Sequence, residues 1–217
     1  MKLYGLKITL QDPLYYASRE LGRFYDTGPY LHNYALSYAL GLARSSYHDP
    51  VHVPHYQQDL LPLNQKGVYV TPAAAREYQL VTHTYKWADL RYQVAMKPKN
   101  ENLPTYGQIR EVAPESSFTA FVFGSLRIPA WIRLGKWFGK AYVEASELEY
   151  TLREGEYIAS HPLNPLDLPT RPKFFDLITM PPVGLVENAR LAGPYLAFKY
   201  QGEDYCLPQG MSYQFAG

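Results

Sequence analysis

The alternation of apolar and polar side chains is clearest near the start of the chain. In residues 3–10, Tyr4, Leu6, Ile8 and Leu10 fall on one side, while a glycine and polar residues fall on the other. Successive side chains of a strand point to opposite faces of its sheet. The pattern therefore predicts a half-buried strand at residues 3–10.

A helical period follows in residues 29–43. Pro29 stands in the first turn, where the N–H group that proline lacks has no partner within the helix. Apolar side chains recur at helical spacing at Leu31, Tyr34, Ala35, Tyr38, Ala39 and Leu42. We therefore predict one principal helix that packs on a sheet. Its predicted packing residues are Leu31, Ala35, Tyr38 and Leu42, and Leu36 and Leu40 remain on the other flank for an insertion or a partner subunit to cover.

The other segments predict strands and loops. Prolines indicate loops over residues 45–65 and 161–173. Segments rich in β-branched and aromatic residues predict strands at 67–72, 117–128, 140–145, 174–180, 194–200 and 205–215.

Residues 73–115 form a long segment without strong periodicity. Between positions 60 and 100, six Lys or Arg residues stand against two acidic residues. Such a basic excursion between regular elements is typical of a segment that reaches toward a partner. The order of elements predicts one α+β domain over 1–217, with an antiparallel sheet, one principal helix, a basic insertion at 60–115 and a strand-rich C-terminal extension from residue 160.

Composition narrows the class of protein. The 217 residues are 47% hydrophobic and carry a formal net charge of +1, which excludes a disordered chain and a uniformly basic surface. Cys206 is the one cysteine, so no intrachain disulfide can form, and no run of 18 uncharged apolar residues occurs. We expect a cytoplasmic protein with no membrane span, no signal peptide and no cofactor.

Positive charge concentrates in the stretch RIPAWIRLGKWFGKA, residues 127–141. Its four cations, Arg127, Arg133, Lys136 and Lys140, alternate with aromatic residues and glycines, and no acid occurs among them. Cations bind phosphates, aromatic rings stack on unpaired bases, and glycines let the backbone approach a ligand. The stretch therefore predicts a site for single-stranded nucleic acid, with Gly135 in an unusual backbone conformation. The alternative is a strand–loop–strand unit with core tryptophans and solvated charges.

The histidines suggest two further kinds of site, one for zinc binding and one for RNA cleavage. His48, Asp49, His52 and His55 in HDPVHVPH offer zinc ligands, but their spacing fits no standard structural zinc site, so a solvent loop is preferred. His32 is a candidate for metal-independent RNA cleavage, in which a 2′-OH group attacks the adjacent phosphate. A single histidine on a helix, however, is more often a packing residue. We predict no metal site and no catalytic residue.

Three polar residues have more than one interpretation. Arg19 and Arg23 flank a glycine in SRELGR, where they contact RNA or pair with nearby acids. Asn33, on the predicted helix, caps the helix, bridges it to a loop or contacts RNA, and the bridge is preferred from the residue alone.

Three blocks of the sequence together resemble a known family. DPLYYASRELGRFYDTGPYLHNYALSYALGL, GVYVTPA and IPAWIRLGKWFGKAYVE are similar, in order and spacing, to blocks of the Cas-five-type (Csc-one) subunit of type I-D CRISPR effector (Cascade) complexes. The resemblance covers residues 1–145. It implies the RAMP superfamily, with a ferredoxin-like, RRM-type fold and a protruding β-hairpin called the thumb.

The resemblance also implies a function. The family caps the 5′ handle of the CRISPR RNA beside the backbone and large subunits, and takes part in target DNA binding indirectly. It is thought to be non-catalytic, and the alternative is a metal-independent endoribonuclease that processes repeat RNA. The residues expected to contact RNA are Arg19, Arg23, Asn33, Lys66, Lys86, Arg91, Arg127, Arg133, Gly135, Lys136, Trp137 and Lys140. RRM-style aromatic residues are not evident on the first strand, so base stacking on the sheet face is not expected.

Overall fold

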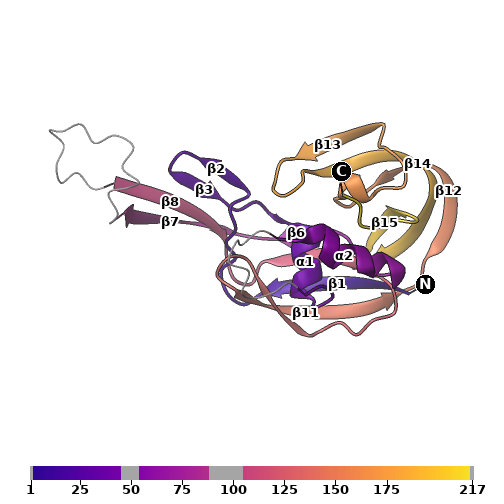
Figure 1. Ribbon diagram of the computed structural model, residues 1–217, viewed down its shortest axis with the longest axis horizontal. Coiled ribbons are helices and arrows are strands. Elements are labelled where there is room, and N and C mark those ends of the chain that lie inside the picture. Colours follow the sequence, from indigo (N-terminus) through magenta and orange to yellow (C-terminus); the bar gives the residue numbers. More distant parts are fainter. Residues whose placement is uncertain (1, 45–53, 88–104, 216–217) are drawn as a thin grey trace.

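Two packed sheets and two helices form a body, from which a narrow arm projects on one side (Figure 1). The computed structural model describes residues 2–44, 54–87 and 105–215. Within these residues the strands form three sheets, and the chain begins at the end of the body farthest from the arm.

The main sheet is centred on β1 (Leu3–Leu10), which pairs antiparallel with β11 (Gly139–Leu148) and β9 (Ser117–Phe123). The sheet continues through β10 (Trp131–Leu134), β6 (Ala73–Glu77), β4 (Tyr30–Leu31) and β5 (Tyr69–Val70). The bounds of the strand predicted at residues 3–10 are confirmed, but the strand is not half-buried, because none of its residues is exposed.

Helix α1 (Asn33–Ala39) is shorter than predicted, and one of the four predicted packing residues is exposed. The helix begins late because the two residues before His32 already pair in β4. His32 caps its start by accepting a hydrogen bond from the Tyr34 backbone N–H.

Leu31 is buried, and Tyr38 and Leu42 are partly buried, as predicted. Leu36 and Leu40 are also buried, in the core with β1 and β9, so the expectation that an insertion or partner subunit covers them is wrong. Ala35 is exposed. The prediction of Ala35 as a packing residue is therefore wrong.

Helix α2 (Tyr56–Gln65) corrects the prediction of a single principal helix, because it is longer than α1 and lies where a loop was predicted. Pro62 lies inside it and removes one backbone N–H from the helical ladder. Leu60 and Leu63 are buried in the core, so tertiary packing outweighs the unfavourable proline.

A second sheet covers the face of β1 that α1 leaves free. It consists of β12 (Thr151–Ala159), β13 (Phe174–Ile178), β14 (Leu185–Tyr200) and β15 (Glu203–Pro208), with a 3₁₀ turn at Pro165–Asp167 before β13. Phe121 of β9 meets the rings of Phe198 and Tyr205 edge-on, with ring centroids 4.9 and 4.7 Å away.

The arm is a third sheet of β2 (Arg19–Leu21), β3 (Phe24–Asp26), β7 (Leu80–Trp87) and β8 (Thr105–Val112). β7 and β8 form an antiparallel hairpin that projects from the body, and β3 pairs with β8 in parallel (Figure 1). The segment 60–115 predicted as an insertion contains this hairpin, but it also contains most of α2 and all of β5 and β6, which belong to the body.

The fold is thus sheet-rich α+β with two helices, and the more specific ferredoxin-like assignment stays a prediction. Several strand limits differ from those predicted. The segment expected at 67–72 keeps only β5, and the one expected at 117–128 ends at Phe123, before Gly124 with a φ of +121°. The described helices are too short and too polar to cross a membrane.

Candidate nucleic-acid interface

The basic stretch singled out in the sequence folds as a β-hairpin. β10 and β11 pair so that Arg133 lies directly opposite Lys140, and both are exposed. Gly135 begins the turn with a φ of +73°, so its predicted unusual conformation is confirmed. An extended strand alone would separate the cations, but the turn brings Arg133 and Lys140 to the same face.

The tip of this hairpin is fixed against the segment that follows β1. The Lys136 backbone N–H donates to the Tyr15 carbonyl oxygen at 2.8 Å. A Cβ atom on Gly135 would lie 2.6 Å from that same oxygen, so only glycine fits there. The Lys140 N–H donates to the Asp12 carboxylate at 2.9 Å. The glycine therefore serves the close approach of two backbone segments.

The outer face of the hairpin combines cations with aromatic rings. Lys140 Nζ lies 4.1 Å from the centre of the Trp131 ring, and Trp131 contacts Tyr142 with ring centroids 4.9 Å apart. Both rings are exposed. Sequence reasoning did not select Trp131 or Tyr142, although their even spacing from Arg133 and Lys140 along each strand was the signal that places them on this face.

Trp137 projects from the turn. Its side chain is 52% exposed and one side of its ring packs against Tyr15, with ring centroids 4.6 Å apart. Phe138 beside it is 61% exposed, and its carbonyl oxygen accepts a hydrogen bond from Arg133 at 3.1 Å. An exposed indole held by a neighbouring ring provides a free face for stacking.

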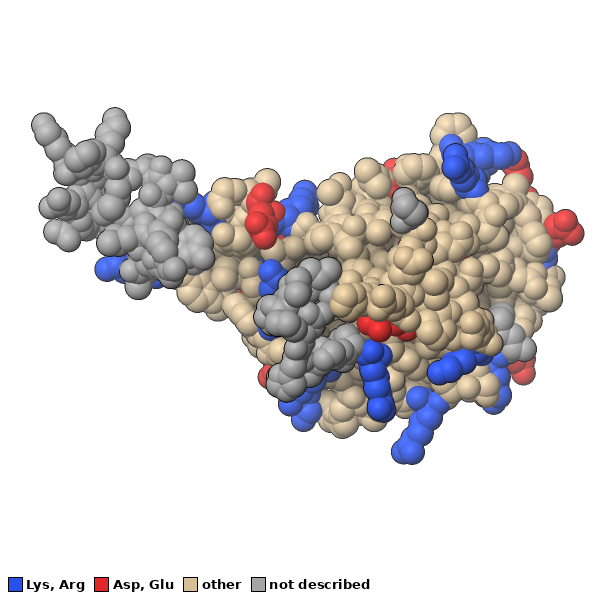
Figure 2. Space-filling model, viewed as in Figure 1, with Lys and Arg blue, Asp and Glu red and all other residues tan. Residues whose placement is uncertain are grey.

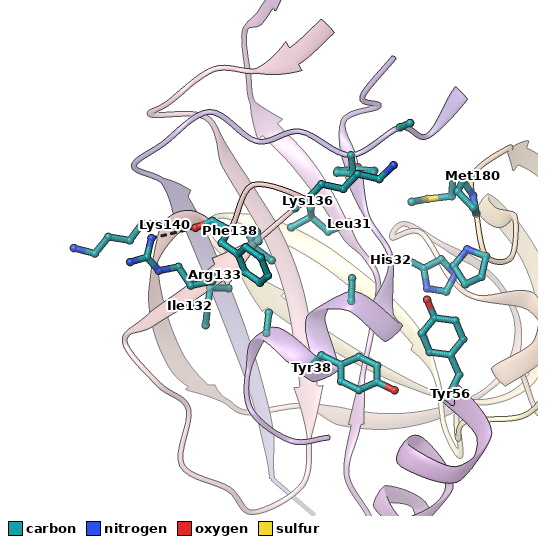
Figure 3. A pocket seen from close by; sticks show the side chains of 18 of the residues that line it. Leu31, His32, Tyr38, Tyr56, Ile132, Arg133, Lys136, Phe138, Lys140 and Met180 are labelled. Carbon is teal, nitrogen blue, oxygen red and sulfur yellow. Dashed lines mark hydrogen bonds between the residues drawn. The ribbon is translucent and has the colours of Figure 1, made fainter. Parts of the chain in front are cut away.

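Behind the turn lies a cavity of about 840 Å³ between the hairpin, the two helices and the segment 180–182 (Figure 3). Its wall is mainly apolar and aromatic, and includes Ala35, Tyr38, Tyr56, Ile132, Phe138 and Met180. In the view of Figure 3, Lys136 extends toward Met180, whereas Arg133 and Lys140 point to the opposite side. The exposed face of α1 thus forms one wall of a pocket.

His32 also lines this cavity and is 96% buried, with 4% of its surface exposed. Burial lowers the pKa of its imidazole to about 4, and the backbone of Val183 opposes this shift. The ring is therefore neutral at pH 7. Nδ1 accepts from the Tyr34 N–H, so the single proton lies on Nε2, which is buried from solvent.

The remaining predicted cations are spread over the molecule. Arg127 is exposed between β9 and β10, Lys66 is exposed at the end of α2, and Lys86 is exposed in β7. Arg91 lies outside the described residues. Figure 2 shows Lys and Arg side chains along the lower edge of the body, where Figure 1 places β11, and others on the arm. None of these three exposed cations lines the cavity behind the turn.

In the arm, the side chain of Asp26 interacts with two arginines, Arg110 and Arg19. Its buried carboxylate accepts a hydrogen bond from Arg110 Nε at 2.7 Å and lies 3.6 Å from an Arg19 nitrogen. Arg19 therefore has a local acidic partner while its side chain stays largely exposed. Arg23 is exposed in the turn between β2 and β3.

Asn33 is a structural bridge, which corrects its assignment as an RNA contact. It is fully buried, and its amide donates to the Asp167 carboxylate at 2.7 Å. Tyr69 also donates to that carboxylate, at 3.0 Å. Burial raises the pKa of Asp167 to about 6, although these hydrogen bonds oppose the shift. The Asn33 side chain has no access to an external ligand.

The metal alternative from the sequence rests on His48, Asp49 and His52, which lie outside the described residues, and on His55, the residue before α2. Among the residues that are described, no group of three His, Cys, Asp or Glu side chains is placed to hold a metal ion.

Of the comparisons with known proteins, one with protein-family models matches almost the whole chain. The family model described as "Type I-D CRISPR-associated protein Cas5/Csc1" matches residues 1–216. A solved structure, described as the crystal structure of a CRISPR protein from Archaeoglobus fulgidus, is 11% identical, with 98% of this chain and 100% of that chain covered and a TM-score of 0.40. No curated protein matches the chain.

Proposed function

Because the chain belongs to the type I-D CRISPR-associated Cas5/Csc1 family, we propose that it is the non-catalytic subunit that binds CRISPR RNA at its 5′ handle. Family membership places the protein in a CRISPR effector complex. The proposal adds that it caps the 5′ end of the guide and anchors neighbouring subunits there for target DNA binding.

One observation carries this proposal, the β10–β11 hairpin. It presents Arg133 and Lys140 opposite each other, Lys136 at the turn and an exposed Trp137 beside them. Cations with an exposed indole suit a flexible single strand, because phosphates and unstacked bases alternate along it.

The residues of the hairpin have different roles in this proposal. Arg133, Lys136 and Lys140 bind phosphates, with a gain in free energy that depends on salt because counterions are released from the RNA. Trp137 stacks on a base with the ring face that Tyr15 leaves free. The backbone bonds from the tip to Tyr15 and Asp12 hold these groups in place before RNA arrives.

The test is binding of single-stranded repeat RNA to the full-length protein as salt is varied. Lys136→Ala with Lys140→Ala should weaken binding roughly tenfold and lower the slope of log K against log salt by about 1.4, since each phosphate contact on a single strand contributes about 0.7. Trp137→Ala should weaken binding with little change in that slope, because stacking releases no counterions. A matched control is Lys2→Ala with Lys199→Ala, two exposed lysines outside the hairpin. Wild-type affinity and slope in the hairpin double variant would contradict the proposal.

The same RNA separates binding from catalysis. Incubated with the protein in EDTA, it should remain intact, as expected for a non-catalytic subunit. Cleavage at one defined position would instead favour the endoribonuclease.

A further inference from the structure

The cavity behind the hairpin turn has the chemistry of a ligand site. Its wall is dominated by apolar and aromatic side chains, and no Asp or Glu belongs to the wall as far as the structure describes it. Lys136 is one of its cations and extends toward Met180, on another part of the wall (Figure 3). A volume of about 840 Å³ falls within the range of pockets that enclose small organic groups.

The charged and aromatic side chains of the wall indicate what kind of group fits. Arg133, Lys136 and Lys140 belong to the wall, and its aromatic side chains include Tyr38 and Phe138. The site therefore fits a flat, largely apolar group that carries a negative charge near these cations.

We propose that this cavity receives one unstacked nucleobase of the bound RNA, with the base between α1 and the hairpin and its phosphate near Lys136. This inference rests on the proposed function and specifies one subsite of it. The phosphate-binding hairpin and the cavity share the same turn, so a strand that follows the cations passes the mouth of the cavity.

A nucleobase fits better than the apolar side chain of a partner protein because the wall carries cations. An apolar side chain gains nothing from Lys136, whereas each nucleotide carries a phosphate that the lysine can bind.

The decisive variant is Ala35→Phe. Ala35 is an exposed residue of α1 on the cavity wall, so a ring there fills the cavity without replacing a core side chain. Its matched control is Ala145→Phe, at an exposed position of β11 that does not line the cavity. Both proteins are titrated with repeat RNA and with a series of the same RNA in which one nucleotide at a time lacks its base.

At one position, removal of the base should weaken binding to the wild type and to Ala145→Phe about tenfold, as expected for loss of one buried base. Ala35→Phe should bind the intact RNA about tenfold more weakly and should be insensitive to that same base removal. An Ala35→Phe protein that binds intact RNA like the wild type, or that shows the wild-type loss at every position, overturns the inference. If Lys136→Ala with Lys140→Ala still weakens RNA binding in that case, the proposed function stands and the subsite alone is wrong.

Two other occupants give distinct results. Saturable binding of AMP, CMP, GMP or UMP that Ala35→Phe abolishes, without coupling to any RNA position, would assign the cavity to a free nucleotide and overturn the inference. Loss of co-purifying subunits in Ala35→Phe, with RNA binding unchanged, would assign it to a protein and overturn it as well.

Discussion

His161 shows how a single buried side chain links the two sheets of the body. Its Nε2 lies 2.7 Å from the Pro72 carbonyl oxygen, and its ring meets Phe121 edge-on at 4.9 Å between centroids. Burial is the main cause that lowers the pKa of this imidazole to about 4, from an ordinary value of 6.5. The folded protein therefore holds His161 neutral at a pH where the unfolded chain binds a proton.

Stability should consequently depend on His161 in mild acid. Between pH 6.5 and 4 the unfolded chain binds more protons at this residue, so its contribution to the free energy of unfolding falls as pH falls. His161→Gln keeps a donor for Pro72 and removes the ionisable group. The loss of stability between pH 6.5 and 4.5, measured by urea unfolding, should shrink by about 2 kcal/mol in this variant.

Two other groups act in the same pH window. His32, whose pKa is also lowered to about 4, acts in the same sense as His161. Asp167, whose pKa is raised to about 6, acts in the opposite sense, because its folded carboxyl group binds the extra proton. The test therefore compares how the free energy of unfolding changes with pH in His161→Gln and in the wild type. Parallel pH profiles of the two proteins would contradict the prediction for His161.

At the scale of the element, one glycine determines how closely the β10–β11 hairpin approaches the segment that contains Tyr15. Gly135 needs both a positive φ and an empty Cβ position against Tyr15. Gly41 has a nearly identical φ of +72° but nothing within 4 Å of its Cβ position. Substitutions at Gly41 and Gly135 therefore distinguish the cost of the positive φ, which both share, from the cost of the close contact, which only Gly135 has.

Gly41→Ala should lower the free energy of unfolding by about 1 kcal/mol through the positive φ alone. Gly135→Ala should cost roughly 1–3 kcal/mol more, because the hairpin tip must move away from Tyr15. Chemical denaturation of both variants measures the difference, and RNA affinity should fall only for Gly135→Ala. Equal costs would show that the tip is free to adjust.

At the scale of the whole molecule, the second sheet leaves apolar side chains uncovered. Phe174 is 71% and Leu177 is 65% exposed on β13, a strand at the edge of that sheet. An exposed apolar edge strand favours pairing with another chain. This surface suits a protein that works within an assembly.

We expect the free protein to self-associate through β13. Phe174→Ser with Leu177→Ser should raise the concentration at which it stays monomeric in sedimentation experiments, while the melting temperature changes little because both residues are exposed. Leu61→Ser, at a less exposed site on α2, is the control. A wild-type protein that is monomeric at high concentration would contradict this expectation.

The sequence by itself determined much of the local structure. Alternation identified β1, because a strand with one more deeply buried face carries a period of two. The composition of residues 127–141 identified the hairpin and its unusual glycine, because charge, aromatic side chains and glycine are local features of the chain.

Only the tertiary structure decided what those local features face. α1 buries Leu36 and Leu40 rather than Ala35, since the position of the sheet selects the face of a helix whose period allows several. α2 forms despite Pro62 because Leu60 and Leu63 reach a core built from distant strands. Asn33 bridges to Asp167, and His32 reaches the cavity behind the hairpin, through contacts between residues far apart in the chain. Such contacts depend on how elements pack, and a period or a local composition carries no information about them.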